Sequence, residues 1–221
     1  MKNKKWLLLL ILALPSTMWL ILETSTINSK KLPIYGPRKV VAANDTVYHT
    51  VTDKFYSLNK QDSSKQELIT LSPDKYPLYV VMFIKDEYKK TDLRLAGLWE
   101  YVNYKKQKIE HIPIILITES ENGRSELQEE LKKLTDGNKN VFFYTWNKQS
   151  FDSLNNSYFL QKPYYIDYSF FTLVDINRNI RGYYDGRYVS EIKRLIDEYQ
   201  HLRLKEEKNK LIKSNEIKTN S

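Results

Sequence analysis

The residue types that most often carry out chemistry are sparse in this chain. Cysteine is absent from all 221 residues. Its absence excludes disulfides, thiolate nucleophiles, iron–sulfur clusters and every zinc or copper site built on cysteine. The three histidines, His49, His111 and His201, are far apart in the sequence, and no serine lies in a nucleophile-elbow motif. We therefore expect these histidines to be surface or capping residues, and we expect no catalytic site and no cofactor.

The net charge of +8 is concentrated at the two ends of the chain, in Lys2, Lys4 and Lys5 and in the segment Lys205 to Lys218. The middle of the chain is closer to balanced, and it shows no pattern of arginines and aromatics typical of a nucleic-acid groove. We therefore predict no nucleic-acid partner. Residues 205–221 are charged and nearly without apolar periodicity, which predicts a disordered tail.

The segment WLLLLILALPSTMWLIL, from Trp6 to Leu22, follows three lysines and precedes Glu23. Its length and its basic leading flank predict a signal anchor over residues 1–23, with the N-terminus in the cytoplasm and the rest of the chain outside. A cleaved signal peptide is the alternative, although the segment lacks a convincing cleavage site. Both interpretations place the remaining chain on the same side of the membrane, after a linker and leading segment over residues 24–45.

The elements that would position any site follow from apolar runs and their periods. The predicted elements are strands at 53–58, 78–84, 112–118, 141–145, 170–175 and 180–184, and helices at 92–108, 125–134 and from 189. Strands alternate with helices and are followed by a hairpin, with a turn at 176–179, and a last helix. This order predicts an α/β fold with a mixed sheet, of thioredoxin-like type, over residues 46–204.

Two segments narrow the fold further. The sequence from Lys31 reads KLPIYGPRKVVAANDTVYHT, and the sequence from Phe171 to Gly186 reads FTLVDINRNIRGYYDG. Together they resemble the SCO/SenC family of copper-handling thioredoxin-fold proteins, over about residues 31–203. In the centre, between Glu87 and Leu160, only the order of strands and helices matches. The resemblance implies a bacterial protein at the cytoplasmic membrane, single-pass, with its domain on the periplasmic side.

The resemblance also implies where the family's copper ligands would be. The family carries a Cys-x-x-x-Cys after its first central strand and a histidine just before the hairpin strand, and these soft ligands suit copper. The matching positions in this chain are Glu87, Thr91 and Asp167. All three ligands are substituted, so copper binding by the family's route is not expected.

The acidic replacements suggest a hard-cation site instead, or an enzyme that uses acids on this loop. Ca²⁺, however, takes about six to eight oxygen ligands. Asp86, Glu87 and Asp167 offer few of them, and three lysines lie between positions 85 and 90. We therefore favour a solvated loop without a metal.

The sequence thus predicts a degenerate SCO-like protein that is not an enzyme and acts as an assembly factor or adaptor through a protein partner at the membrane. The alternative is an accessory factor in copper delivery or cytochrome c oxidase maturation, acting with a complete SCO protein. Aromatic residues near the hairpin could form a partner surface or fill a thin core. These are Tyr164, Tyr165, Tyr168, Phe170, Phe171, Tyr183 and Tyr184.

Overall fold

The computed structural model describes residues 14–15, 17–18, 32–42, 45–58, 66–71, 73–85, 111–119, 140–160 and 170–219. The chain divides into two compact units, Met1–Leu32 and Pro33–Ser221. In the first, Thr17 Oγ1 donates a hydrogen bond to Leu14 O at 3.1 Å. Most of the predicted anchor, and the predicted helices at 92–108 and 125–134, lie outside the described residues. Within the described residues, no helix is both long and apolar enough to cross a bilayer.

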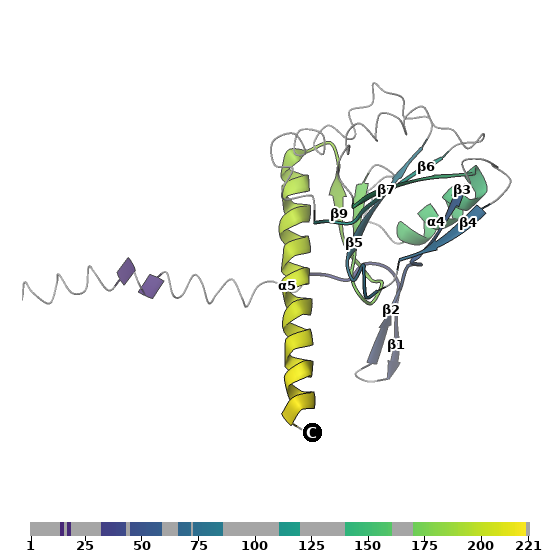
Figure 1. The fold of residues 1–221 in the computed structure, drawn as a ribbon. Coiled ribbons are helices and arrows are strands. Elements are labelled where there is room, and N and C mark those ends of the chain that lie inside the picture. Colours follow the sequence, from purple (N-terminus) through teal and green to yellow (C-terminus); the bar gives the residue numbers. More distant parts are fainter. Residues whose placement is uncertain are drawn as a thin grey trace, which may run out of the picture. The chain divides into compact units, whose positions relative to one another are not determined.

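A five-stranded mixed sheet forms the centre of the second unit, in the order β7-β6-β5-β8-β9 (Figure 1). Its strands are β5 (Tyr79–Ile84), β6 (Ile114–Glu119), β7 (Val141–Trp146), β8 (Phe170–Val174) and β9 (Ile180–Asp185). The first three run parallel, and β8 and β9 form the predicted antiparallel hairpin beside β5. All five strands lie close to their predicted positions, because continuous apolar runs mark strands that are covered on both faces.

Helices α4 (Lys148–Tyr158) and α5 (Val189–Thr219) cover opposite faces of this sheet. Successive residues of a strand point to opposite faces. Tyr183 donates its hydroxyl hydrogen bond to Tyr158 O in α4, whereas its neighbour Tyr184 bonds to Glu198 in α5. On the α4 face, Phe83 of β5 contacts the rings of Phe151 and Tyr158. The aromatics of the hairpin thus fill the core.

Burial confirms this for the described aromatic residues of the hairpin. Phe170, Phe171, Tyr183 and Tyr184 are all at most 5% exposed. The core-filling interpretation is therefore confirmed for them, because each ring is enclosed by the sheet and a helix. Tyr164, Tyr165 and Tyr168 lie outside the described residues.

Two further hairpins precede the sheet (Figure 1). In the first, β1 (Arg38–Ala42) pairs with β2 (Asp45–Tyr48), and in the second, β3 (Lys54–Leu58) pairs with β4 (Gln66–Thr70). The strand expected at 53–58 is therefore present, the residues between β3 and β4 lie outside the described part of the chain, and the β1–β2 hairpin was not expected.

Helix α4 was not predicted, although its signals are in the sequence. Asn147 is its N-cap, and its side chain accepts a hydrogen bond from Ser150 N at 2.9 Å. Phe151, Leu154 and Tyr158 recur at helical spacing and are buried. The polar residues between them hide this stripe from a search for long apolar runs.

Helix α5 continues to Thr219, so the prediction of a disordered tail over residues 205–221 is wrong for the part that the structure describes. The segment is rich in Lys and Glu, which favour helix even where nothing packs against them. An (i, i+4) ion pair between Arg203 and Glu207, at 3.5 Å, adds a small stabilisation. Charge alone therefore did not indicate disorder here.

Candidate functional site

The positions that match the family's copper ligands, Glu87, Thr91 and Asp167, lie outside the described residues, as does Asp86. The strands that flank them are described. Met82 of β5 pairs with Phe171 of β8 in antiparallel register. The chain therefore leaves β5 after Ile84 at the same edge of the sheet where it enters β8 at Phe170. This end of the strands is here called the ligand edge. It is the place to which the sequence assigns the candidate site.

Two threonines lie at the ligand edge, on the two strands that follow one another on one side of β5. Thr118 of β6 and Thr145 of β7 are register partners, and their Oγ1 atoms are 3.2 Å apart. Thr118 Oγ1 also donates to Tyr144 O at 3.3 Å, and both threonines are buried. Hydroxyl oxygens are poor ligands for copper, which prefers thiolate, thioether and imidazole. In the described part of the chain, no three His, Asp or Glu side chains are grouped so that they could hold a metal ion.

The three histidines lie in separate parts of the fold. His49 Nε2 is 3.1 Å from Ser157 O and so connects the segment before β3 to α4. His111 is exposed, and its backbone oxygen accepts a hydrogen bond from the Tyr199 hydroxyl at 3.4 Å. His201 lies in α5.

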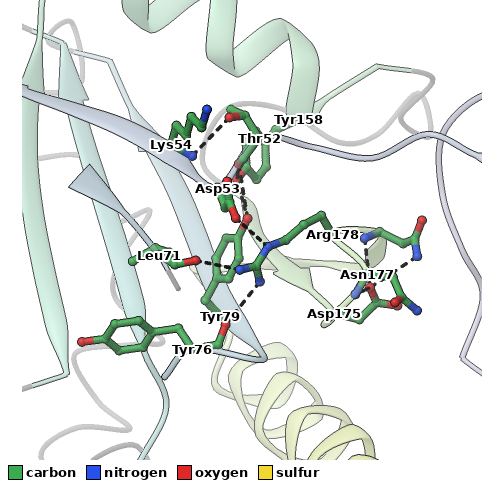
Figure 2. Close-up of polar contacts among 11 residues, drawn as sticks. Thr52, Asp53, Lys54, Leu71, Tyr76, Tyr79, Tyr158, Asp175, Asn177 and Arg178 are labelled. Carbon is green, nitrogen blue, oxygen red and sulfur yellow. Dashed lines mark hydrogen bonds and ion pairs between the residues drawn. The ribbon is translucent and has the colours of Figure 1, made fainter. Parts of the chain in front are cut away.

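The densest polar network of the described residues lies at the opposite end of the sheet, around Arg178 (Figure 2). Its Nε bonds to Asp53 Oδ2 at 3.2 Å, Nη1 to Tyr76 O at 3.2 Å, and Nη2 to Leu71 O at 2.7 Å. The guanidinium carbon also lies 5.2 Å from the centre of the Tyr79 ring. One side chain thereby connects the β8–β9 turn to the segments before β3, after β4 and before β5.

The turn that presents Arg178 is organised by Asp175. Its Oδ1 accepts hydrogen bonds from the backbone N–H groups of Asn177 and Asn179, both at 2.9 Å, which makes an Asx-type turn. Its Oδ2 pairs with Arg181 at 2.9 Å. In the turn predicted at 176–179, the residue with φ = 64° is Arg178 and neither asparagine. The asparagines shape the turn instead by donating their amides to Asp175.

A pair of buried tyrosines lies beside this network. The hydroxyls of Tyr79 in β5 and Tyr158 in α4 are 3.0 Å apart, and Thr52 O lies within hydrogen-bond distance of both, at 3.3 and 2.9 Å. Burial is the main cause that raises the pKa of each phenol well above its ordinary value of 10. These phenols are therefore neutral, structural hydrogen-bonding groups, and neither is activated as a base or nucleophile.

These buried phenols predict sensitivity to alkali. Burial likewise raises the pKa of Tyr184, and that of Tyr199 to about 12. Because the folded pKa exceeds the unfolded value, the stabilisation is complete below pH ~10 and is lost as pH rises through the folded pKa. We expect the free energy of unfolding in urea to be constant from pH ~8 to ~9.5 and to fall above pH ~10, by up to about 1.4 kcal/mol per pH unit for each such tyrosine, so that the urea midpoint falls as well.

The measurement is urea unfolding followed by circular dichroism at each pH, with tyrosinate absorbance read in parallel. Tyr158→Phe is the matched variant, because it removes one of these phenols and should make the alkaline loss less steep. A midpoint that is the same at pH 9 and pH 11 would contradict the prediction.

A surface hollow of about 530 Å³ lies along α4. Its lining residues are Thr52, Lys54, Trp146, Gln149, Ser150, Ser153, Leu154 and Ser157. Lys54 is the single charged residue of this lining. The sequence gives no sign of this hollow, because its residues come from three separate segments.

Comparison with known proteins tests the fold. No protein-family profile matches the chain, and no curated protein does. Among solved structures, a SCO1/SenC family lipoprotein from Bacillus anthracis str. Ames matches with a TM-score of 0.52 and 16% identity. The match covers 70% of this chain and 96% of the other. The chain has the SCO1/SenC fold. The thioredoxin-like α/β fold expected from the sequence is thereby confirmed.

Two other similar structures have TM-scores below 0.5. The soluble domain of Sco1 from Bacillus subtilis has a TM-score of 0.45 at 16% identity, over 66% of this chain and 92% of the other. A putative electron transfer protein from Aquifex aeolicus VF5 has a TM-score of 0.48 at 12% identity, over 71% and 96%. At such low identities the likeness concerns the fold and transfers no ligand or activity. The likeness in fold to the SCO1/SenC family lipoprotein belongs to a chain without a single cysteine.

Proposed function

We propose that this chain is a membrane-anchored, extracytoplasmic SCO-type protein that works without thiol or copper chemistry, as an adaptor or assembly factor for another protein. The observation that carries the proposal is the SCO1/SenC fold in a chain with no cysteine. A chain without cysteine cannot carry out thiol chemistry, whereas its folded domain can still bind a partner protein. The apolar segment from Trp6 to Leu22 would be its anchor, with the domain on the outer side of the cytoplasmic membrane.

The donor set at the ligand edge supports the absence of copper. The aligned positions carry two carboxylates and a hydroxyl in Glu87, Asp167 and Thr91. These hard oxygen donors do not replace two thiolates and an imidazole for copper. In the described part of this edge, Thr118 and Thr145 add only hydroxyls that bond to each other. No step of a reaction is therefore assigned to a metal.

The first test is copper retention. The full chain, purified in detergent, is mixed with Cu(I) or Cu(II), desalted and analysed by mass spectrometry. We expect less than one tenth of an equivalent of copper, because the soft ligands are missing. Stoichiometric retention that survives desalting would overturn the proposal.

The chain offers a matched control for this test. The triple variant Glu87→Cys, Thr91→Cys and Asp167→His restores the family's ligand types at the aligned positions. If the alignment is right, this variant should hold about one copper where the natural chain holds none. A restored site would also show that the scaffold still brings the two loops together at the ligand edge.

The SCO1/SenC fold also favours a second candidate, an accessory role in copper delivery or cytochrome c oxidase maturation beside a complete SCO protein. Deletion of the gene, followed by assay of terminal oxidase activity in membranes, separates the two. An unchanged oxidase activity removes the maturation role and leaves the adaptor role. Isolation of the chain from membranes by cross-linking would then identify its protein partner.

A further inference from the structure

The β1–β2 hairpin exposes apolar side chains that nothing in the described chain covers. Val40, Val41 and Val47 are 74%, 68% and 54% exposed. The hairpin is a separate two-stranded sheet. Val40 pairs with Thr46, and Val47 with Lys39, so valines lie on both of its faces. Apolar groups on both faces suit a shallow contact at an interface rather than docking of one flat face, and the exposed carboxylate of Asp45, which pairs with Ala42 next to the turn, opposes deep insertion of the tip.

The base of the hairpin is fixed to the domain. His49 N donates to Pro37 O across the base, and Tyr35 N donates to Ile180 O in β9, both at 2.9 Å. The His49 ring also meets Ser157 O in α4. The half of the hairpin that carries the valines is thus held in a defined direction, which lowers the entropy cost of any contact that it makes.

The edges of the hairpin do not favour addition of a partner strand. A β-bulge interrupts its register between Val40 and Ala42, and β1 carries Arg38 and Lys39 next to the exposed valines. Bulges and edge cations are the features that protect exposed strands from pairing. A partner that pairs with the backbone is therefore disfavoured.

Charge and tether length favour a lipid surface. From Lys30 to Tyr48 the chain has four cations and one acid, Asp45. Valines beside cations suit an interface that is apolar below and carries anionic phosphates above. Leu32 follows Leu22 by ten residues, a span of at most about 36 Å. If residues 6–22 are anchored, as the proposed function requires, this tether keeps the hairpin at a high effective concentration near the bilayer, where a weak contact suffices.

We propose that the β1–β2 hairpin places its exposed valines in the lipid interface of the anchoring membrane, with Arg38 and Lys39 on anionic headgroups. The hairpin thereby sets the orientation of the domain on the membrane. The inference rests on the proposed anchor, so its test must also report on the anchor.

The natural absence of cysteine makes the test direct, because one introduced cysteine gives one labelled site. Val41→Cys and Val47→Cys are labelled with an environment-sensitive fluorophore in the full chain. Each is reconstituted in phosphatidylcholine vesicles with and without phosphatidylglycerol. Ser190→Cys, at an exposed position of α5, is the matched control. We expect the labels at 41 and 47 to show blue-shifted emission and quenching by nitroxide lipids, more strongly with phosphatidylglycerol, and the label at 190 to show neither.

Flotation of the vesicles after an alkaline wash reports on the anchor separately. If the chain floats but the labels at 41 and 47 behave like the label at 190, the hairpin inference is overturned and the anchor stands. If the chain does not float, the anchor and the inference are both overturned. If the labels at 41 and 47 are shielded from water in native membranes but not in pure lipid vesicles, the hairpin contacts a protein partner and the lipid contact is overturned. The Arg38→Glu/Lys39→Glu variant should lose the blue shift and still float.

Discussion

Replacing Arg178 by methionine is expected to lower the free energy of unfolding by about 3 kcal/mol. The side chain is 11% exposed, and its guanidinium donates hydrogen bonds to Asp53, Leu71 O and Tyr76 O at once. Methionine keeps the length of the stem but removes every donor. The carboxylate of Asp53 and two backbone carbonyls would then lose the donors that compensate for their burial. Urea unfolding of the purified chain measures the loss.

Arg187→Met is the matched control for this prediction. Arg187 also pairs with an aspartate, Asp185, but its side chain is 40% exposed. Asp185 is only 8% exposed, but it keeps its hydrogen bond from the Arg187 backbone N–H and solvent reaches the Arg187 side chain, so the loss should be smaller than at Arg178, about 1 kcal/mol. A cost at Arg178 no larger than that at Arg187 would show that the network of Figure 2 does not hold the segments together.

The backbone at Arg178 allows a sharper comparison. Its φ of 64° is in the left-handed region, which costs most residues roughly 1 kcal/mol but glycine very little. Arg178→Gly should therefore be less destabilising than Arg178→Ala, although glycine is normally the more costly of the two. The opposite order would contradict the turn geometry that Asp175 organises.

Gly182→Ala is expected to destabilise the domain by about 2 to 3 kcal/mol. A Cβ atom at this position would lie 2.2 Å from the Tyr184 hydroxyl oxygen and 2.6 Å from its Cζ. The Tyr184 ring cannot move aside cheaply, since it is fully buried and its hydroxyl bonds to Glu198 at 2.5 Å. Arg194 also lies over its ring, 4.7 Å from the centre. Chemical unfolding again gives the measurement.

A double-mutant cycle isolates this clash. In a Tyr184→Leu background the outer part of the ring is gone, so Gly182→Ala should cost at least 1 kcal/mol less than in the natural chain, as contacting residues show coupling of this size. The Tyr184→Leu variant alone will also be destabilised, which is why the coupling and not the single effect is the test. Additive effects would mean that the alanine is accommodated by the backbone and not opposed by the ring.

Much of the sheet could be predicted from the sequence because the pattern of β5 and β6 is local. Each is a run of apolar and β-branched residues, and the turn residues around Asp175 mark the hairpin. Helix α4 was not predicted because its apolar residues, such as Phe151 and Tyr158, are separated by polar residues. The sequence pattern underestimates the length of α5. Its last residues are charged and lack apolar periodicity, which is typical of disorder, although Lys and Glu favour helix.

The sequence by itself determined that no thiol chemistry is available and that the fold is α/β, because these depend on residue types and local periods. Only the tertiary structure decided that Arg178 connects four segments, that Tyr79 meets Tyr158, and that the β1–β2 hairpin leaves its valines uncovered. The contacts of Arg178 and of the two tyrosines join residues that are more than 70 positions apart, as Tyr79 and Tyr158 are. No local pattern specifies which distant groups meet, since the packing of the sheet and its helices determines that.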